Sequence, residues 1–329
     1  MSTLVTGACG FIGCNVVEQL LAGGRSVTAV DLDHNWPADA ETHFGRLPGQ
    51  LRFFAADVLD ELALHRVLES TPAAGVIHAA AITPGREREA RDADLIARVN
   101  LLGTLRVLAA ARTHGVRRVV YPSSASVYGA AAFPPRSLDE GRDVPIPNAT
   151  YGITKYAAER TALRMRELWG MDVVAARVGA AFGPWERDTG VRDTLSGPML
   201  ATRAMLRGEA VVLTREGPCD WVYAPDVAGA LIALLDAASP DHEVYHVSAG
   251  RHWTLAAWCR QLAARLGAEL FRLDPNPDRA TIELGARDRA PLSIERLLPL
   301  YQPRFGLSQA LEHYLGWLGT RSPAWHAAW

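Results

Sequence analysis

A tyrosine and the only lysine of the sequence stand four residues apart, in the segment Tyr151-Gly-Ile-Thr-Lys155. Every other basic residue among the 34 is an arginine, so the exception marks a place where a compact ammonium serves and a planar guanidinium would not. Four residues apart on a helix, the two side chains share one face, and the ammonium can favour the ionised phenol. The spacing predicts an acid/base pair. The alternative is that the lysine follows the tyrosine by chance, and this alternative holds only if no other motif indicates the same chemistry.

A glycine-rich segment follows the first apolar run and precedes the first helical pattern. It reads Gly7-Ala8-Cys9-Gly10-Phe11-Ile12-Gly13. In this context, glycines let backbone N–H groups approach a pyrophosphate at the N-terminus of a helix. The pattern GxxGxxG therefore predicts a dinucleotide site, and a tight turn without a ligand is the alternative for the loop taken alone. The residues expected to contact the dinucleotide are Gly7, Gly10, Phe11, Ile12 and Gly13.

Acidic residues follow the second and third apolar runs. Asp31 stands where a carboxylate accepts hydrogen bonds from an adenosine ribose. A carboxylate there would repel a 2′-phosphate, which favours NAD over NADP, although Arg25 and His34 are near enough to leave the choice open. Asp57, followed by Val58, either reaches the adenine or caps the next helix, and both alternatives stay open.

Short apolar runs alternate with longer amphipathic segments through the first half of the chain. This rhythm is typical of a buried parallel sheet with crossover helices. It predicts an α/β fold with a Rossmann-type doubly wound parallel sheet. Strands are expected at 3–6, 27–30, 51–55, 75–78, 118–121 and 173–177, and helices at 11–22, 62–68, 95–114 and 151–169.

Glycines and prolines break this pattern soon after residue 178. We therefore expect an NAD-binding Rossmann domain over residues 1–178 and a smaller, loop-rich C-terminal substrate domain over residues 179–329. Residues 222–248 are expected to return to the first domain, because they contain a helical pattern and one more strand pattern. Further helices are expected at 199–207, 227–235, 255–266 and 308–318, and the further strand at 244–247.

The composition is that of an ordinary globular protein. The chain has 329 residues, of which 49% are hydrophobic, and a formal net charge of −2 without a basic run. Neither nucleic acid nor a membrane is therefore expected as a partner. The glycine loop begins too soon after Met1 for a signal peptide to fit, so a cytoplasmic location is expected. The four cysteines are scattered and have no metal-ligand spacing, so neither a metal nor a disulfide is expected.

Taken in order, these motifs resemble those of the extended short-chain dehydrogenase/reductases, within the NAD-dependent epimerase/dehydratase family. About two thirds of the chain takes part in the resemblance. It rests on the glycine loop, Asp31, the strand end His78-Ala79-Ala80-Ala81, Asn100, the segment Ser123-Ser124-Ala125-Ser126-Val127-Tyr128-Gly129, Tyr151 with Lys155, and residues 177–184.

The resemblance implies a catalytic triad of Ser124, Tyr151 and Lys155 beside a bound NAD. It further implies a homodimer that pairs the helices at 95–114 and 151–169. For His78, a structural role is preferred to the role of a catalytic base. Cofactor contacts are implied for Val58, Ala79, Ala80, Asn100, Tyr151 and Lys155 in addition to the glycine loop and the two acidic residues.

Two departures from the family pattern bear on the substrate. The dehydratases of the family carry Asp-Glu directly after the catalytic hydroxyl residue, and this chain has Ala125 and Ser126, so elimination of water is not expected. Nucleotide-sugar epimerases carry an Arg-Asp pair where this chain has Cys219 and Asp220. The usual arginine anchor for a diphosphate is therefore absent from that position.

The segment 183–194 is the expected substrate loop. Its Arg187 or Arg192 can bind a small carboxylate with two parallel hydrogen bonds. Surface ion pairs with neighbouring acidic residues are the alternative for both arginines. Arg287, together with Arg289, can serve a phosphate and keeps a nucleotide-linked substrate in view. The expected substrate residues are Thr83, Ser124, Trp185, Arg187, Arg192 and Arg287.

The sequence thus predicts an NAD-dependent oxidoreductase that transfers a hydride from a secondary alcohol of a sugar or sugar-derived acid. Tyr151 exchanges the hydroxyl proton in that reaction. One alternative is a nucleotide-sugar 4-epimerase that uses tightly bound NAD for a transient oxidation. A non-catalytic NAD-binding sensor is the alternative from another class, and the intact Ser-Tyr-Lys set argues against it.

Overall fold

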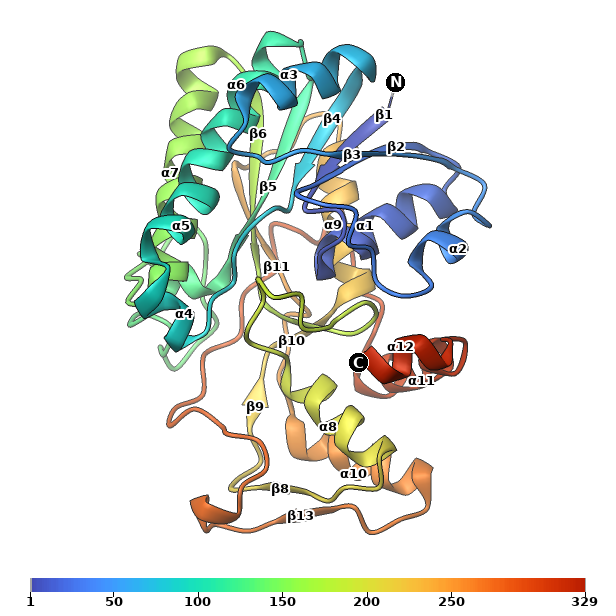
Figure 1. Cartoon of the computed structure of the whole chain (residues 1–329). Coiled ribbons are helices and arrows are strands. Elements are labelled where there is room, and N and C mark those ends of the chain that lie inside the picture. The colour runs from blue at the N-terminus through green and yellow to red at the C-terminus, as the bar shows by residue number, and fades with distance from the viewer. Residues whose placement is uncertain (1, 329) are drawn as a thin grey trace.

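Seven parallel strands form the central sheet, and helices cover both of its faces (Figure 1). The computed structural model describes residues 2–328. The strand order is β3-β2-β1-β4-β5-β6-β11, so the predicted Rossmann-type doubly wound sheet is confirmed. The strands are β1 (Ser2–Thr6), β2 (Ser26–Asp31), β3 (Gln50–Ala55), β4 (Ala73–His78), β5 (Arg118–Ser124), β6 (Asp172–Val178) and β11 (Val244–Val247).

The order of the strands reverses between β1 and β4. From β1 the chain moves outward through β2 and β3, and it then returns to the other side of β1 to form β4. Connections leave in opposite directions at this point, which opens a crevice at the carboxyl ends of the strands where ligands of such sheets bind. The glycine loop after β1 and the strand ends of β4 and β5 all lie at this crevice.

The helices pack on the sheet in two layers. The helices α1 (Phe11–Ala22) and α9 (Ala224–Asp236) pack together on one face. The opposite face carries α3 (Glu61–Ser70), α6 (Thr104–Thr113) and α7 (Thr150–Trp169). Short helices not foreseen from the sequence are α2 (Ala40–Phe44), α4 (Arg86–Arg91) and α12 (Pro323–Ala328).

The single helix expected at 95–114 is instead three consecutive helical segments. The chain forms α5 (Ala93–Ala97), a π-helical segment η1 (Arg98–Gly103) and then α6. Within η1, Asn100 directs its side-chain amide to Ile82 and Thr154 rather than to solvent. A π-helical turn places one extra residue in the turn, and such turns occur frequently at functional sites.

The C-terminal part lies beyond the carboxyl edge of the sheet, as the lower lobe of Figure 1. Its helices are α8 (Gly197–Leu206), α10 (Leu255–Leu266) and α11 (Leu307–Gly319). Three two-stranded pairs join them: β7 (Ala180–Phe182) with β10 (Trp221–Tyr223), β8 (Val211–Leu213) with β13 (Phe271–Leu273), and β9 (Pro218–Cys219) with β12 (Trp253–Thr254). No helix between residues 2 and 328 has both the length and the apolar character needed to cross a membrane.

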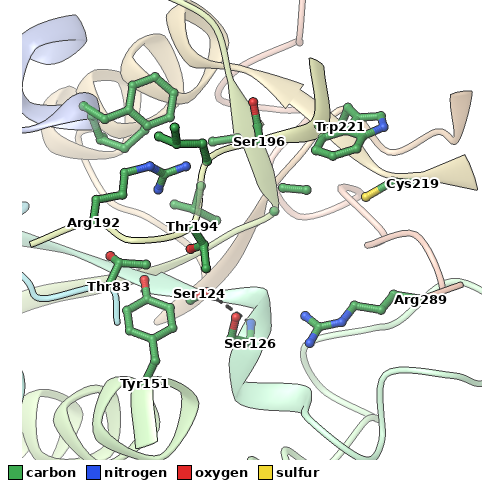
Figure 2. Close-up of a pocket in the computed structure, with 18 of the residues that line it drawn as sticks. Thr83, Ser124, Ser126, Tyr151, Arg192, Thr194, Ser196, Cys219, Trp221 and Arg289 are labelled. Carbon is green, nitrogen blue, oxygen red and sulfur yellow. Dashed lines mark hydrogen bonds between the residues drawn. The ribbon is translucent and has the colours of Figure 1, made fainter. Parts of the chain in front are cut away.

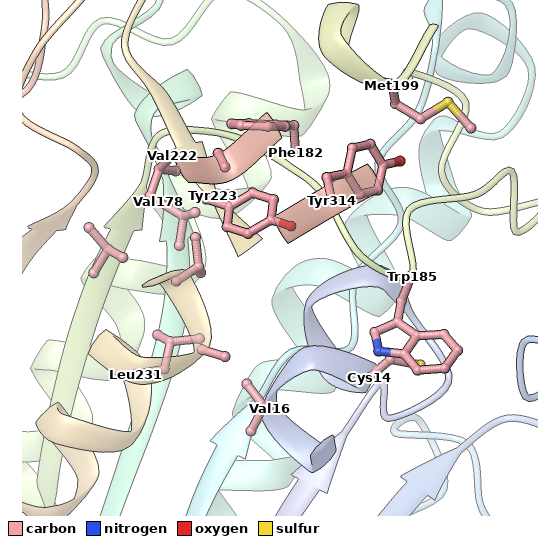
Figure 3. Close-up of a cluster of buried hydrophobic side chains, with 14 of the residues drawn as sticks. Cys14, Val16, Val178, Phe182, Trp185, Met199, Val222, Tyr223, Leu231 and Tyr314 are labelled. Atoms are coloured by element: carbon pink, nitrogen blue, oxygen red, sulfur yellow. The ribbon is translucent and has the colours of Figure 1, made fainter. Parts of the chain in front are cut away.

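Phe182 packs among aromatic rings of this lobe, and Figure 3 shows it near Tyr223. Its ring centroid lies 5.2 Å from those of Tyr223 and Trp258 and 5.4 Å from that of Trp253. The side chain is buried in the same hydrophobic core that contains α1 and α9. This packing holds β7 and β10 at a fixed distance from the carboxyl edge of the sheet.

Replacement of Phe182 by alanine should lower the free energy of unfolding by about 3–5 kcal/mol, because it removes a buried ring and leaves a cavity. Urea unfolding followed by tryptophan fluorescence measures the change. A loss below about 1 kcal/mol would mean that the surrounding aromatic rings collapse into the space and that Phe182 does not hold the lobe in place.

Candidate active site

A cavity of about 710 Å³ opens at the carboxyl ends of the central strands and extends into the C-terminal lobe (Figure 2). It brings together twelve of the residues predicted from the sequence to form the site. They are Gly7, Gly10, Phe11, Ile12, Gly13, Ala79, Thr83, Ser124, Tyr151, Lys155, Arg192 and Arg287.

Ser124 and Tyr151 enter this cavity from adjacent elements. Ser124 is the last residue of β5, and its Oγ accepts a hydrogen bond of 3.1 Å from the backbone N–H of Ser126. Tyr151 lies in the first turn of α7, and its hydroxyl points toward Thr83 in Figure 2. Burial raises the pKa of Tyr151, whereas hydrogen bonds with Ser124 and Thr83 and the charge of Arg192 act in the opposite direction. The phenol therefore needs further positive charge before it can act as a base near neutral pH.

The charge of Arg192 acts on the phenol of Tyr151, a role that was predicted for Lys155. Nη2 of Arg192 donates a hydrogen bond of 2.8 Å to Oε1 of the fully buried Glu186. The guanidinium carbon lies 4.9 Å from the ring centroid of Phe11, the first residue of α1. Arg192 thus lies between the glycine loop and Tyr151, and its ion pair is with a buried carboxylate rather than with a surface one.

Lys155 is buried one turn further along α7. Its Nζ lies 4.2 Å from the centroid of the Tyr121 ring, in a cation–π contact. Burial lowers the pKa of Lys155 to about 7, and the charge of Glu159 acts in the opposite direction. The amine is therefore poised between its charged and neutral forms near neutral pH. His78, whose role was predicted to be structural, bonds to Thr6 and Thr104, and burial lowers its pKa to about 3.

The glycine loop has no room for side chains. A Cβ on Gly7, whose φ is +64°, would lie 2.6 Å from the backbone nitrogen of Ala80, and one on Gly13 would lie 2.0 Å from the oxygen of Gly7. The first intrahelical bond of α1 runs from the Cys14 N–H to the Gly10 oxygen. The N–H groups of residues 11–13 thus precede it and have no acceptor within the helix.

Asp31 braces this loop and is not among the residues that line the cavity. Its Oδ2 accepts a hydrogen bond of 2.8 Å from the Cys9 N–H, and its Oδ1 accepts one of 2.8 Å from Leu32. Each carboxylate oxygen keeps a second lone pair for a ribose hydroxyl. Arg25, which left the choice between NAD and NADP open, pairs with Asp236 instead.

Asp57 and Val58 do not line the cavity. Asp57 accepts a hydrogen bond of 2.8 Å from the N–H of Leu59, and Asp60 is the residue that caps α3. The helix-cap alternative for Asp57 was therefore wrong. Val58 packs beneath η1, where a Cβ on Gly103 would lie 2.8 Å from its Cγ2. Ala80 also supports the site from behind the cavity wall, because its backbone packs against Gly7 of the glycine loop.

Asn100, predicted to touch the cofactor, has its side chain fully engaged elsewhere. Its Oδ1 accepts from the Ile82 N–H at 2.8 Å, and its Nδ2 donates to the Ile82 oxygen at 3.0 Å and to Thr154 Oγ1 at 3.2 Å. These bonds tie the turn that carries Thr83 to helix α7. Asn100 thus holds the walls of the cavity together and is not among the residues that line it, and its contact with the cofactor stays a prediction.

Two predicted substrate residues lie outside the cavity. Trp185 is fully buried among aromatic side chains, and its Nε1 donates a hydrogen bond of 2.7 Å to Glu18. Arg187 donates hydrogen bonds to the backbone oxygens of Cys9 at 3.3 Å and Asn35 at 2.9 Å. It therefore links loop 183–194 to the glycine loop and to the segment after β2. Both expectations are therefore corrected. The spacing within loop 183–194 did not reveal which side of the loop faces the cavity.

The far end of the cavity is lined by arginines of the C-terminal lobe. The guanidinium of Arg287 lies 4.1 Å from the ring centroid of Phe133. Arg289 reaches between Ser126 and Cys219 in Figure 2. The sequence had placed Arg289 only as a companion of Arg287. Lining residues that the sequence did not single out are Ser196 and Arg215, whereas Thr194 belongs to the predicted substrate loop.

Comparison with known proteins agrees with this geometry. The model of the NAD-dependent epimerase/dehydratase family matches residues 3–248. A UDP-glucose 4-epimerase of Mycolicibacterium smegmatis is 32% identical over 70% of this chain and 72% of its own length. A dTDP-glucose 4,6-dehydratase of Streptomyces niveus is 30% identical over 85% of this chain and 82% of its own. The crystal structure of a Thermus thermophilus UDP-glucose 4-epimerase in complex with NAD superposes with a TM-score of 0.77 at 27% identity, covering 96% and 99% of the two chains.

The chain belongs to the NAD-dependent epimerase/dehydratase family. The members it resembles are enzymes, and NAD is the cofactor of the family. The residues present fit that cofactor. The glycines leave the backbone bare at the N-terminus of α1, and the N–H groups there have no acceptor within the helix, as a diphosphate site requires.

Gly13→Ala tests this fit, because the new methyl group would clash with the Gly7 backbone. A steric cost of about 1–3 kcal/mol within the loop should weaken NAD binding by about tenfold or more. Isothermal titration calorimetry with NAD measures the affinity. The matched control is Gly316→Ala, in a helix where an added methyl group meets nothing within 4 Å. Equal affinities for both variants and the wild type would show that NAD does not approach this loop.

Proposed function

We propose that this enzyme is a nucleotide-sugar epimerase that oxidises a secondary alcohol of the sugar and reduces the resulting ketone from its other face. One observation carries the proposal: a single cavity joins the glycine loop and Tyr151 at one end to Arg215, Arg287 and Arg289 at the other. Such a cavity suits a sugar with an anionic group attached. Residues 1–178 with 222–248 would hold the cofactor, and the rest of the C-terminal part would hold the substrate.

The proposed proton transfer uses groups that already face one another. Ser124 would hold the hydroxyl oxygen of the substrate, and Tyr151 would take its proton as the alcohol is oxidised. The positive charges of Lys155 and Arg192 favour the phenolate form of Tyr151. NAD, when bound, supplies the hydride acceptor and donor. Tyr151 then returns the proton when the ketone is reduced.

Elimination of water is a less favourable use of the site. The two residues after Ser124 are Ala125 and Ser126, and neither side chain can protonate a leaving hydroxyl as a carboxyl group does. Ser126 lines the cavity near Ser124 and offers a neutral hydrogen bond instead.

A net dehydrogenase acting on a sugar-derived acid is the second candidate. It is favoured by one observation, which is that Cys219 lines the cavity where many nucleotide-sugar epimerases have an arginine. Arg192, close to the phenol, would then receive the carboxylate of a small substrate. We rank this candidate second because the chain is similar to a UDP-glucose 4-epimerase.

Incubation with UDP-glucose, UDP-glucuronate and dTDP-glucose separates the two candidates. We expect a 4-epimer to appear in the proton NMR spectrum while the absorbance of NADH stays constant. Tyr151→Phe should slow the conversion by about 100-fold or more, because proton transfer is lost, and should leave NAD binding intact. Steady accumulation of NADH with aldonates or uronates would favour the dehydrogenase. No turnover of any of these compounds would contradict the proposal.

We also propose a homodimer that uses the outer face of α5, η1 and α7. These helices pack against one another and leave four large apolar side chains exposed to solvent: Leu95, Leu102, Ile153 and Leu168. Exposed apolar groups that cluster in this way are typical of protein interfaces. The resemblance to the extended short-chain dehydrogenase/reductases implies the same pairing of helices.

Ile153→Asp should convert such a dimer to a monomer, because a charge would be buried at its centre. Size-exclusion chromatography with light scattering gives the mass in solution. Leu62→Asp, on the remote helix α3, is the matched control for an exposed apolar residue and should leave the dimer unchanged. A wild-type protein that elutes as a monomer would refute the proposed dimer.

A further inference from the structure

A fully buried carboxylate lies one helical turn beyond Lys155. Glu159 forms two hydrogen bonds with Arg177 of β6, of 2.7 Å from Nη2 and 3.1 Å from Nε. It also accepts a hydrogen bond of 2.7 Å from the hydroxyl of Ser123. Ser123 directly precedes Ser124 in β5, and Ser123 pairs with Arg177 in the register of β5 and β6. Glu159 therefore links the helix of Lys155 to the strand end of Ser124 without lining the cavity.

The charges in this region do not balance pairwise. Lys155 and Arg177 are both buried, and Glu159 is the carboxylate that faces both of them. Residues four apart on a helix share a face. The single negative charge of Glu159 therefore pairs directly with Arg177 and also acts on Lys155 one turn away. The titratable groups around Lys155 are Tyr151 and Glu159 on α7, Tyr121 on β5 and His78 on β4, with Arg177 behind Glu159.

The same carboxylate begins a buried chain of hydrogen bonds that leads from Arg177 to the backbone of Ser293. Arg177 donates to the hydroxyl of Tyr128 at 2.7 Å, and that hydroxyl lies 2.6 Å from Nε2 of His246. Nδ1 of His246 lies 2.8 Å from the backbone oxygen of Ser293. A carbonyl accepts only, so Nδ1 carries the proton and Nε2 accepts from Tyr128.

We propose that Glu159 is a positioning residue for Lys155: its buried carboxylate holds the amine in the charged form and fixes the strand end that carries Ser124. The role rests on the proposed use of Lys155 in proton transfer. Without the carboxylate, two buried cations would face each other with no counter-charge, and the lysine is the one able to release a proton. The charged amine would then persist over a narrower range of pH, and the alkaline limit of activity would move to lower pH.

The sequence offers a direct measurement of this charge, because the chain contains one lysine. Protein labelled with ¹³C at lysine Cε should give a single lysine resonance, so its titration needs no assignment and no substrate. In the wild type we expect the midpoint near pH 7, since burial lowers the pKa of Lys155 to about 7. Glu159→Gln keeps the shape and removes the charge, and it should lower the midpoint by about one pH unit or more. Glu159→Asp should restore most of the shift.

Two further variants keep the test decisive. Arg177→Gln removes the cation that shares Glu159, so it should move the midpoint upward, and it provides a test of opposite sign if Glu159→Gln does not fold.

Asp226→Asn is the matched control, because Asp226 is also a buried carboxylate but bonds to Tyr301 and the backbone of residues 304 and 305, away from the cavity. A midpoint that stays the same in the folded Glu159→Gln and Arg177→Gln proteins, or that falls equally in Asp226→Asn, would overturn the proposal. Because no substrate is used, this result is separate from the outcome of the epimerase assay.

Discussion

Burial of one ammonium group beside the carboxyl edge of a parallel sheet is the constraint on which the rest of this site depends. Lys155 is almost entirely shielded from water, and an unpaired charge in such surroundings tends to lose its proton. The face of the Tyr121 ring and the carboxylate of Glu159 oppose that loss. Neither residue lines the cavity. The proton chemistry proposed for Tyr151 is thus supported by side chains that a substrate would never touch.

The path of the backbone brings the cofactor groove and the proposed acid/base residues to the same cavity. The reversal of strand order between β1 and β4 opens the crevice. At its floor, the backbone of Gly7 packs closely against the backbone that follows β4. Asn100 then binds the turn after β4 to helix α7, so the groove and the helix cannot move independently. A rigid floor would serve the hydride transfer proposed for this site, because such a step tolerates little error in the distance between the reacting atoms.

The sheet, the glycine loop and the placement of Tyr151 and Lys155 on one helix could be predicted because each depends on neighbours in the sequence. Apolar runs and helical periods are local, and so is a spacing of four residues. The π-helical segment around Asn100 depends on bonds to Ile82 and Thr154, which no local pattern records. Loop 183–194 shows the same limit, since its packing against α1 decides that Trp185 turns inward. Glu159 gave no signal either, because a glutamate on an amphipathic helix ordinarily faces solvent.

The position of Arg289 changes the weight of the departure at Cys219. In the sequence, a cysteine where related epimerases have an arginine argued against a nucleotide-linked substrate. In the fold, Arg289 lines the same cavity as Cys219. Burial raises the pKa of the Cys219 thiol, and the charge of Arg289 acts in the opposite direction. The positive charge comes from a segment about seventy residues later in the chain. An anion at this end of the cavity can therefore be bound without the usual arginine, and the missing residue is weak evidence about the substrate.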